Sequence, residues 1–293
     1  MNEFARQIET PNIAVITPHQ LSAVSTREIF ELLGEYGAIL FRSCIHTPET
    51  FSDFVASHSS RLSLDPARTM VGAAAQLVDA GTDAVGLHCE NGNSPFWPDL
   101  TWFYCQQAPR KGSQTTICDG EQVLGSLSAQ CRDFFESNDI RYSRTVPGEM
   151  WRRLVCHYSR TVDDPANVYF DDLLALVDGT PGTTITYNGE SDAIHYSFVT
   201  SAIQISSFSN RPAFANSILG PSYNYEQPVI DTAAGIPIPT TFLDEVQDVS
   251  ALATHPVGWQ DNDTIVLDNR RVMHGRQAII DMRRVIFNAL SYR

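Results

Sequence analysis

The chain has 293 residues, of which 43% are hydrophobic, and a formal net charge of −14 at pH 7. A chain of this length can bury a large core, and it contains no apolar run long enough to span a bilayer, so we expect no membrane span. The negative charge argues against a nucleic-acid partner, because phosphate binding needs a concentrated basic surface.

The N-terminal residues 1–12 are polar and acidic, whereas a secretory signal needs a basic start followed by an apolar stretch. We therefore expect a cytoplasmic protein. The six cysteines form no CxxC pair, which favours free, buried or half-buried thiols over a disulfide framework or a zinc ribbon.

Three segments of the first half have the apolar spacing of amphipathic helices: residues 25–37, 46–59 and 127–138. The first has Ser25 or Thr26 as a candidate N-cap and ends at Gly37, and the second has Thr47 as N-cap with Pro48 at the first helical position. The segments that follow the first and third helices, 38–42 and 139–146, are typical of strands.

The second half turns toward β structure. Four segments rich in β-branched and aromatic residues are separated by Gly, Pro, Asn and Asp: residues 183–188, 194–208, 263–269 and 283–293. One helix is predicted over 240–254, capped by Thr240 or Thr241. Because helices and strands do not alternate regularly, the pattern favours one domain over 1–293, a β sandwich or barrel with peripheral helices, over a doubly wound α/β sheet.

The stretch LHCENGNSPFWPDL, residues 87–100, contains the first candidate metal ligands. In an extended segment His88 and Glu90 point to the same side, and Cys89 points away into the core. One imidazole and one carboxylate make two-thirds of a facial triad that leaves open positions on iron(II). The best third ligand is His274, just beyond the predicted strand DTIVL.

Several segments, in the same order, resemble the iron(II)- and 2-oxoglutarate-dependent oxygenases of the taurine dioxygenase (TauD/TfdA) type, the clavaminate synthase-like proteins included. They are LHCENGNSPFWPDLTWFYCQQAPRKGSQTTICDG, RPAFANSI, GIPIPTTFLDEV, and GWQDNDTIVLDNRRVMHGR followed by RRVIFNALSYR. The resemblance implies a double-stranded β-helix (jelly roll) with peripheral helices. It also implies iron(II) bound by His88, Glu90 and His274, with 2-oxoglutarate as cosubstrate and O₂ as oxidant.

The resemblance further implies that Thr115 hydrogen-bonds 2-oxoglutarate, although Thr115 as a plain turn or strand residue is an open alternative. An arginine on the last strand should bind the distal carboxylate, because a guanidinium matches a carboxylate with two parallel hydrogen bonds. Arg284 is favoured and Arg283 is the alternative. Two glycines of the family pattern are replaced here by Ser113 and Asn262, both at turns that tolerate them.

The implied reaction is the oxidation of an unactivated C–H bond in an amino acid or natural-product intermediate, with succinate and CO₂ as co-products; in some relatives the substrate is tethered to a carrier protein. Glu90 favours hydroxylation or desaturation over halogenation, because halogenating relatives replace this carboxylate with a small residue. A variable insert over 141–200 is the expected place of substrate recognition. The candidate substrate residues are Trp151, His195, Tyr196 and Asn216.

Two other classes are kept as alternatives: a zinc-dependent hydrolase with the same ligand types, and a non-catalytic binding protein on a jelly roll. Asp268 and Asn269 are expected to shape the turn before His274 through side-chain-to-backbone bonds. Arg271 and Arg276 are expected to be solvated or salt-bridged.

Overall fold

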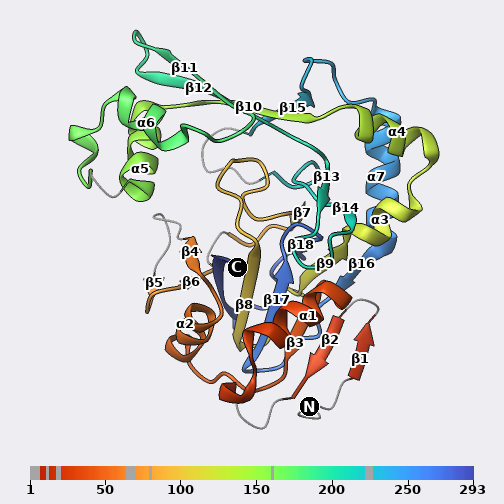
Figure 1. Ribbon diagram of the computed structural model, residues 1–293. Helices are drawn as coiled ribbons and strands as arrows, with labels where there is room; N and C mark the ends of the chain where they lie inside the picture. The colour runs from red at the N-terminus through yellow and green to blue at the C-terminus, as the bar shows by residue number, and fades with distance from the viewer. Residues whose placement is uncertain are drawn as a thin grey trace.

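The computed structural model describes residues 7–10, 13–17, 21–63, 70–78, 81–159, 162–221 and 227–293. Two mainly antiparallel sheets form the core (Figure 1). The larger sheet has the order β1 (Gln7–Thr10), β2 (Ile13–Ile16), β3 (Ala38–Phe41), β17 (Asp263–Asp268), β8 (Leu100–Gln107), β19 (Val285–Tyr292), β6 (Ala75–Leu77) and β5 (Met70–Val71), and β4 (Arg61–Ser63) pairs with β19. The smaller sheet has the order β16 (Thr254–Pro256), β9 (Thr115–Asp119), β18 (Val272–Arg276) and β7 (Val85–His88).

Strand β17 lies at the centre of the larger sheet, and all six of its residues are buried. It pairs on one side with β3, more than 200 residues earlier in the chain, and on the other side with β8. A strand that is buried on both faces has an apolar run at its middle, here Ile265, Val266 and Leu267. Each fully buried Ile, Val or Leu side chain contributes about 1.5–3 kcal/mol through removal of its surface from water.

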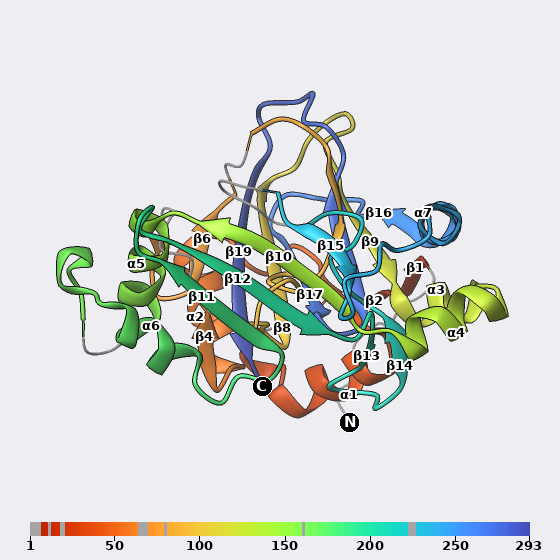
Figure 2. The same ribbon diagram turned by 90° about the horizontal axis from the view of Figure 1, so that it is seen from above.

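The segment predicted as a variable insert forms a separate layer. In Figure 1 this layer lies across one end of the core, and Figure 2 shows the same strands from above. Its sheet has the order β11 (Thr183–Asn188), β12 (Ala193–Thr200), β10 (Ile140–Val146) and β15 (Val229–Thr232), and helices α5 (Gly148–Tyr158) and α6 (Phe170–Val177) lie at one end. A short hairpin of β13 (Ile203–Ile205) and β14 (Pro212–Phe214) follows this layer in the chain.

The helices predicted in the first half are present as α1 (Thr26–Tyr36), α2 (Pro48–Ser57) and α4 (Ala129–Ser137). Ser25 and Glu28 form a capping box on α1, and Gly37 ends this helix with φ of 77°. The Thr47 side chain accepts a hydrogen bond at the start of α2. These local signals were sufficient because each helix has both a cap and an apolar face.

Three differences from the predicted elements have local causes. Helix α7 (Thr240–Ala253) begins after Pro239, which stands at the N-cap without a side-chain hydrogen bond, so neither predicted threonine caps it. The predicted long strand over 194–208 is broken between β12 and β13. Helices α5, α6 and the short α3 (Gly120–Ser126) were not predicted; the N-cap residues of α5 and α6 are Pro147 and Tyr169, which lack the side chains of the usual Ser, Thr, Asp or Asn caps.

The architecture is mainly β with peripheral helices, and it is the double-stranded β-helix predicted from the sequence. All six cysteines are free, and four of them are buried. Within the described residues, no helix is both long and apolar enough to cross a membrane.

Candidate active site

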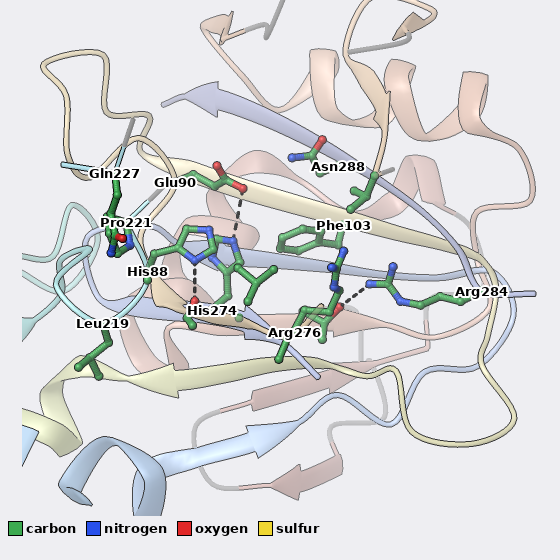
Figure 3. A pocket seen from close by; sticks show the side chains of 17 residues that line it. His88, Glu90, Phe103, Leu219, Pro221, Gln227, His274, Arg276, Arg284 and Asn288 are labelled. Atoms are coloured by element: carbon green, nitrogen blue, oxygen red, sulfur yellow. Dashed lines mark hydrogen bonds and ion pairs between the residues drawn. The ribbon is translucent and has the colours of Figure 1, made fainter. Parts of the chain in front are cut away.

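His88, Glu90 and His274 lie together at one face of the smaller sheet, with Glu90 just beyond the end of β7. One ligand atom of each residue lies within 4.8 Å of those of the other two, and all three residues are buried. The His274 Nε2 atom is 3.4 Å from Glu90 Oε1, and the two imidazole rings are 4.4 Å apart between centroids. Figure 3 shows the three side chains converging at one end of a cavity.

Strand pairing brings the two histidines together. His88 is the last residue of β7, and its direct partner on β18 is His274. Side chains of directly paired residues point to the same face of a sheet, about 4.5–5.5 Å apart at Cβ. Glu90 follows two residues later, where the chain leaves the strand and turns at Asn91 with φ of 55°.

A backbone hydrogen bond fixes the tautomer of His88. Its Nδ1 atom lies 2.9 Å from the Gly86 carbonyl oxygen, which can only accept, so Nδ1 carries the proton. The lone pair of the neutral ring is then on Nε2, as expected when a backbone carbonyl orients a metal-binding histidine. Nδ1 of His274 is buried and has no hydrogen-bond partner within the described part of the chain.

The donor set fits a divalent first-row metal such as iron(II). Two imidazoles and one carboxylate bind such ions at about 2.0–2.2 Å, so neighbouring donors lie about 3 Å apart. The 3.4 Å separation of His274 Nε2 and Glu90 Oε1 is close to that spacing. Because all three ligands come from one side, the remaining coordination positions would face the cavity.

The Asn269 side chain holds the backbone on both sides of Glu90. Its Oδ1 accepts from the Glu90 amide at 2.9 Å, and its Nδ2 donates to the carbonyl oxygens of Glu90 and Pro98 at 3.0 and 2.9 Å. The Asn269 carbonyl in turn accepts from the Trp97 indole at 3.1 Å. The expected side-chain-to-backbone bonding is present. The side chain of Asn269, however, bonds to the segment that contains Glu90 and not only to the turn before His274.

A close backbone contact fixes the position of the C-terminal end of β7. A Cβ atom on Gly86 would lie 2.4 Å from the Leu219 carbonyl oxygen, and one on Gly220 would lie 2.4 Å from the Gly86 carbonyl carbon. Only glycine allows two backbone segments to approach this closely. Nearby, the Asn216 carbonyl accepts from the Cys89 amide at 3.0 Å, and the Ser217 hydroxyl donates to the Cys89 carbonyl at 3.0 Å.

Arg284 and Thr115 lie in the same cavity as the metal-ligand cluster, and this cavity has a volume of about 540 Å³. The Arg284 Nη2 atom donates to Thr115 Oγ1 at 3.4 Å, and the Trp259 indole donates to the same oxygen at 3.2 Å. Burial, together with the charge of Arg276, lowers the pKa of Arg284 to about 10. The guanidinium is still protonated at neutral pH, and its buried Nε has no hydrogen-bond partner within the described residues.

Arg283 lies outside this cavity. It is bound to Asp281 with its Nη2 atom 2.6 Å from Oδ2, and its side chain is 44% exposed. Both arginines precede β19, in a turn where the Arg284 amide donates to the Asp281 carbonyl oxygen at 3.3 Å, and Arg283 is held there by Asp281. Between the two, the structure therefore brings Arg284 and not Arg283 to the site.

The expectation for Arg276 was wrong. Arg276 is buried in the cavity wall rather than solvated, and its Nη2 donates to the carbonyl oxygens of Gly81 and Asp83 at 3.1 and 2.6 Å. It lies two residues after His274 on β18, so strand alternation would have predicted that both side chains face the cavity. Arg271 is salt-bridged as expected, with its Nη2 atom 2.7 Å from Asp119 Oδ2, but it is buried.

The four candidate substrate residues do not form one site. Tyr196 lines a second, smaller cavity beside the insert, whereas His195 is exposed on the opposite face of β12. Trp151 is buried in the core of the insert, and its indole donates to the Asp192 carbonyl oxygen at 3.2 Å. Asn216 is buried, and its side chain bonds to the backbone of Ala202 and Ile218.

Sequence reasoning missed several residues that line the main cavity, because they come from elements distant in the chain. Phe103 of β8 lies against His274, with ring centroids 5.1 Å apart. Gln227 and Asn288 line the same cavity and are labelled in Figure 3. From the sequence alone, only the alternation of side chains along β19 indicates that Asn288 lies on the same face as Arg284 and Ile286.

A jelly roll that brings two histidines, one carboxylate and a buried arginine into one cavity has the arrangement of the non-haem iron oxygenases. Comparison with known families agrees. Residues 2–290 match the family model described as taurine catabolism dioxygenase TauD, TfdA family, and the chain belongs to this family of dioxygenases. The family resemblance inferred from the sequence is thus confirmed.

Individual relatives are distant. A clavaminate synthase-like protein of Arabidopsis thaliana is 22% identical over 281 residues, which cover 87% of this chain and 82% of the relative. Among solved structures, PvcB of Pseudomonas aeruginosa has a TM-score of 0.62 at 13% identity, covering 99% of this chain and 91% of PvcB. A taurine dioxygenase of Burkholderia xenovorans has a TM-score of 0.59 at 12% identity, covering 98% and 89%. These likenesses show the shared fold.

Proposed function

We propose that the chain is an iron(II)- and 2-oxoglutarate-dependent oxygenase that oxidises a C–H bond of a small molecule and forms succinate and CO₂ as co-products. The observation that carries this proposal is the position of a two-histidine, one-carboxylate cluster in one cavity with the half-buried Arg284. Family membership supports the same reaction class.

His88, Glu90 and His274 would hold the metal. Iron bound there supplies oxygen activation coupled to the oxidative decarboxylation of 2-oxoglutarate. The chain's own part is positioning: the Gly86 carbonyl orients His88, and Asn269 holds the backbone of Glu90. Buried surroundings also keep bulk water from the reacting groups.

Arg284 and Thr115 would bind the distal carboxylate of 2-oxoglutarate. The Arg284 guanidinium is protonated and half-buried, with its Nε atom buried, so a carboxylate ligand would recover much of the free energy that its partial desolvation costs. A complex of Mn(II) and N-oxalylglycine, which has the skeleton of 2-oxoglutarate, is present in the similarly folded AAD-2, with a TM-score of 0.63 at 14% identity over 99% of this chain and 97% of AAD-2. In this proposal residues 1–293 form a single oxygenase domain.

The proposed substrate is a small molecule of the amino-acid or natural-product type, either free or tethered to a carrier protein. PvcB is an Fe, α-ketoglutarate-dependent oxygenase from an isonitrile synthetic pathway, which supports a biosynthetic role by similarity of fold. The carboxylate at Glu90 favours hydroxylation or desaturation, because halogenation needs a free metal position for chloride.

The test has a binding arm and a turnover arm. We expect Mn(II) and N-oxalylglycine together to raise the melting temperature of the full chain more than either alone, since each ligand would bind only the folded state. With iron(II), oxygen and a panel of amino acids, at least one compound should increase succinate formation from 2-oxoglutarate.

Glu90→Ala should abolish the metal-dependent stabilisation and the succinate signal. Glu149→Ala, which removes an exposed carboxylate that pairs only with Arg153 among the described ion pairs, is the matched control and should retain both. Hydrolytic activity with zinc that needs no 2-oxoglutarate would overturn the proposal in favour of the zinc hydrolase.

A further inference from the structure

A second cavity, which we call the side pocket, lies between the insert and the turn that follows Glu90. Its volume is about 170 Å³. Aliphatic and aromatic side chains from β10, α5, α6, β11 and β12 form most of its wall, and residues 91–96 close it on the other side. The roles derived above for the metal and for 2-oxoglutarate leave this cavity unused.

The side pocket adjoins the main cavity. Glu90 lines the main cavity and Asn91 lines the side pocket. Consecutive Cα atoms are about 3.8 Å apart, so the turn of backbone at Glu90 and Asn91 borders both cavities. A ligand in the side pocket would therefore lie beside the segment that carries a proposed metal ligand.

The wall formed by residues 91–96 is well supported. Phe96 stacks on Tyr158 of α5, with ring centroids 4.3 Å apart and an interplanar angle of 10°. The Asn91 side chain donates to the Phe96 carbonyl at 3.2 Å, and the Ser94 amide donates to the Asn91 carbonyl at 2.9 Å. These contacts hold residues 91–96 in place, so the pocket has a defined shape.

Size and chemistry identify the group that fits. An apolar cavity of about 150 Å³ holds one benzene ring, and the side pocket is slightly larger. Its apolar lining includes Leu154, Ile185 and Ile194, whereas Arg144 and Asn93 are polar residues of the lining. A ring that bears a hydrogen-bonding substituent matches this division between apolar and polar surface.

We propose that the side pocket binds a phenyl-sized ring of the substrate, and that the enzyme acts on small molecules in which this ring is linked to a hydrogen-bonding group. This inference rests on the proposed function, since it names the substrate class of the same enzyme. It places recognition of the ring at the insert and the oxidation in the main cavity, both beside the turn at Asn91.

The experiment uses the full chain and two fluorinated probes. The first is 4-fluorobenzyl alcohol, which has a ring and a hydroxyl, and the second is 2-fluoroethanol, which has the hydroxyl without the ring. Fluorine NMR titrations measure the Kd of each probe with the metal-free protein, so the result does not depend on turnover. We expect the ring probe to bind at least about ten times more tightly, because only the ring buries apolar surface.

Two filling variants and one control locate the binding. Leu154→Trp and Ile185→Trp introduce an indole from opposite walls at half-exposed positions, so at least one should fold. Each should weaken binding of 4-fluorobenzyl alcohol about tenfold or more. Leu174→Trp changes an equally exposed leucine of α6 that does not line the pocket, and it should leave the Kd unchanged.

The outcomes separate this inference from the proposed function. Equal binding of both probes, or unchanged binding in both filling variants, would overturn the ring pocket even if succinate is formed. Ring binding that is lost in the filling variants, without succinate formation from any ring-bearing substrate, would retain the pocket and overturn the oxygenase assignment. Adding Mn(II) gives a further check, since it should broaden the fluorine signal of a ring bound beside Glu90, whereas Zn(II) should not.

Discussion

Asn269 makes three hydrogen bonds to backbone groups through one buried side-chain amide, and two of these groups belong to Glu90. Replacement by alanine would leave a buried donor and two buried acceptors unpaired, at a cost of about 1–3 kcal/mol each. Outer contacts of this kind typically change metal affinity by about 10–100-fold.

We therefore predict that Asn269→Ala lowers the free energy of unfolding by several kcal/mol, and weakens Mn(II) binding by about 10–100-fold. Urea unfolding and electron paramagnetic resonance titration would measure the two effects. Asn167→Ala removes an exposed asparagine from the insert and should change neither quantity. Normal Mn(II) affinity in Asn269→Ala would show that Glu90 does not need this support.

The neighbouring arginines Arg283 and Arg284 provide a second test at this scale. Arg284→Gln should raise the Kd for N-oxalylglycine by about 100-fold or more, because the half-buried guanidinium is the proposed partner of its carboxylate. Arg283→Gln is the matched control, since it removes the same charge from a half-exposed position and should change the Kd less than threefold. Calorimetric titration in the presence of Mn(II) measures both values, and equal losses would refute the assignment to Arg284.

Residue types and spacing were enough to predict the three candidate metal ligands, because His88 and Glu90 are local and His274 stands in a recognisable segment. The supporting residues could not be predicted in this way. Asn269 acts on a backbone segment 179 positions earlier in the chain, and nothing in its own neighbourhood indicates that contact. The place of Arg276 in the cavity wall follows from strand alternation two residues after His274, a rule that the expectation of a solvated or salt-bridged arginine did not apply.

At the scale of elements, the contact of β7 with residues 219–220 has the strictest geometry. Gly86→Ala would push a methyl group against the Leu219 carbonyl, 2.4 Å from the Cβ position. We predict a lower melting temperature and at least tenfold weaker Mn(II) binding, because the strand would have to move and His88 with it. Thermal unfolding and metal titration of the same preparation would measure this.

Gly125→Ala is the matched control for that substitution. Gly125 is exposed in α3, and nothing lies within 4 Å of its Cβ position. Alanine is favoured over glycine in a helix by about 0.5–1 kcal/mol, so this variant should be slightly more stable and bind Mn(II) normally. A Gly86→Ala protein that behaves like Gly125→Ala would contradict the close-contact argument.

The helices that could be predicted are those whose ends are marked by local sequence signals, such as an N-cap residue or a terminating glycine. Helices α1 and α2 have caps, and α1 also ends at a glycine, so even their bounds were nearly correct. The helices of the insert lack such signals, and the fold of 141–200 emerged only with the sheet of β10, β11 and β12. The side-pocket variants and their control, which test this layer, were therefore chosen from the structure and not from sequence patterns.

At the scale of the whole molecule, stability should depend on pH through Asp268. Burial raises the pKa of this carboxyl to about 6, against an ordinary value of 3.8, although Ser206 and the Arg270 amide donate to it. Between these pH values the unfolded chain loses the proton while the folded chain keeps it. Stability from this group is therefore present below about pH 4 and is lost as the pH rises to about 6, by about 3 kcal/mol.

Asp268→Asn, which keeps an acceptor but does not titrate, isolates this effect. The difference in unfolding free energy between the two proteins should change in favour of the variant across pH 4–6, and it should be constant above pH 7. Urea unfolding at half-unit pH intervals measures the difference. A difference that does not vary with pH would mean that Asp268 titrates normally in the folded protein.

The pairing of β3 with β17 and of β8 with β19 joins the two halves of the chain, and His88 meets His274 only when β7 and β18 pair. At a synthesis rate of about 5–20 residues per second, the 186 residues between the two histidines (274 − 88) take about 10–40 s to emerge from a ribosome. Throughout that interval the first half exposes strands whose partners do not yet exist. Production of this protein therefore depends on how well the nascent N-terminal half is protected from aggregation. Truncation after residue 270 would leave an insoluble chain with two of the three candidate metal ligands.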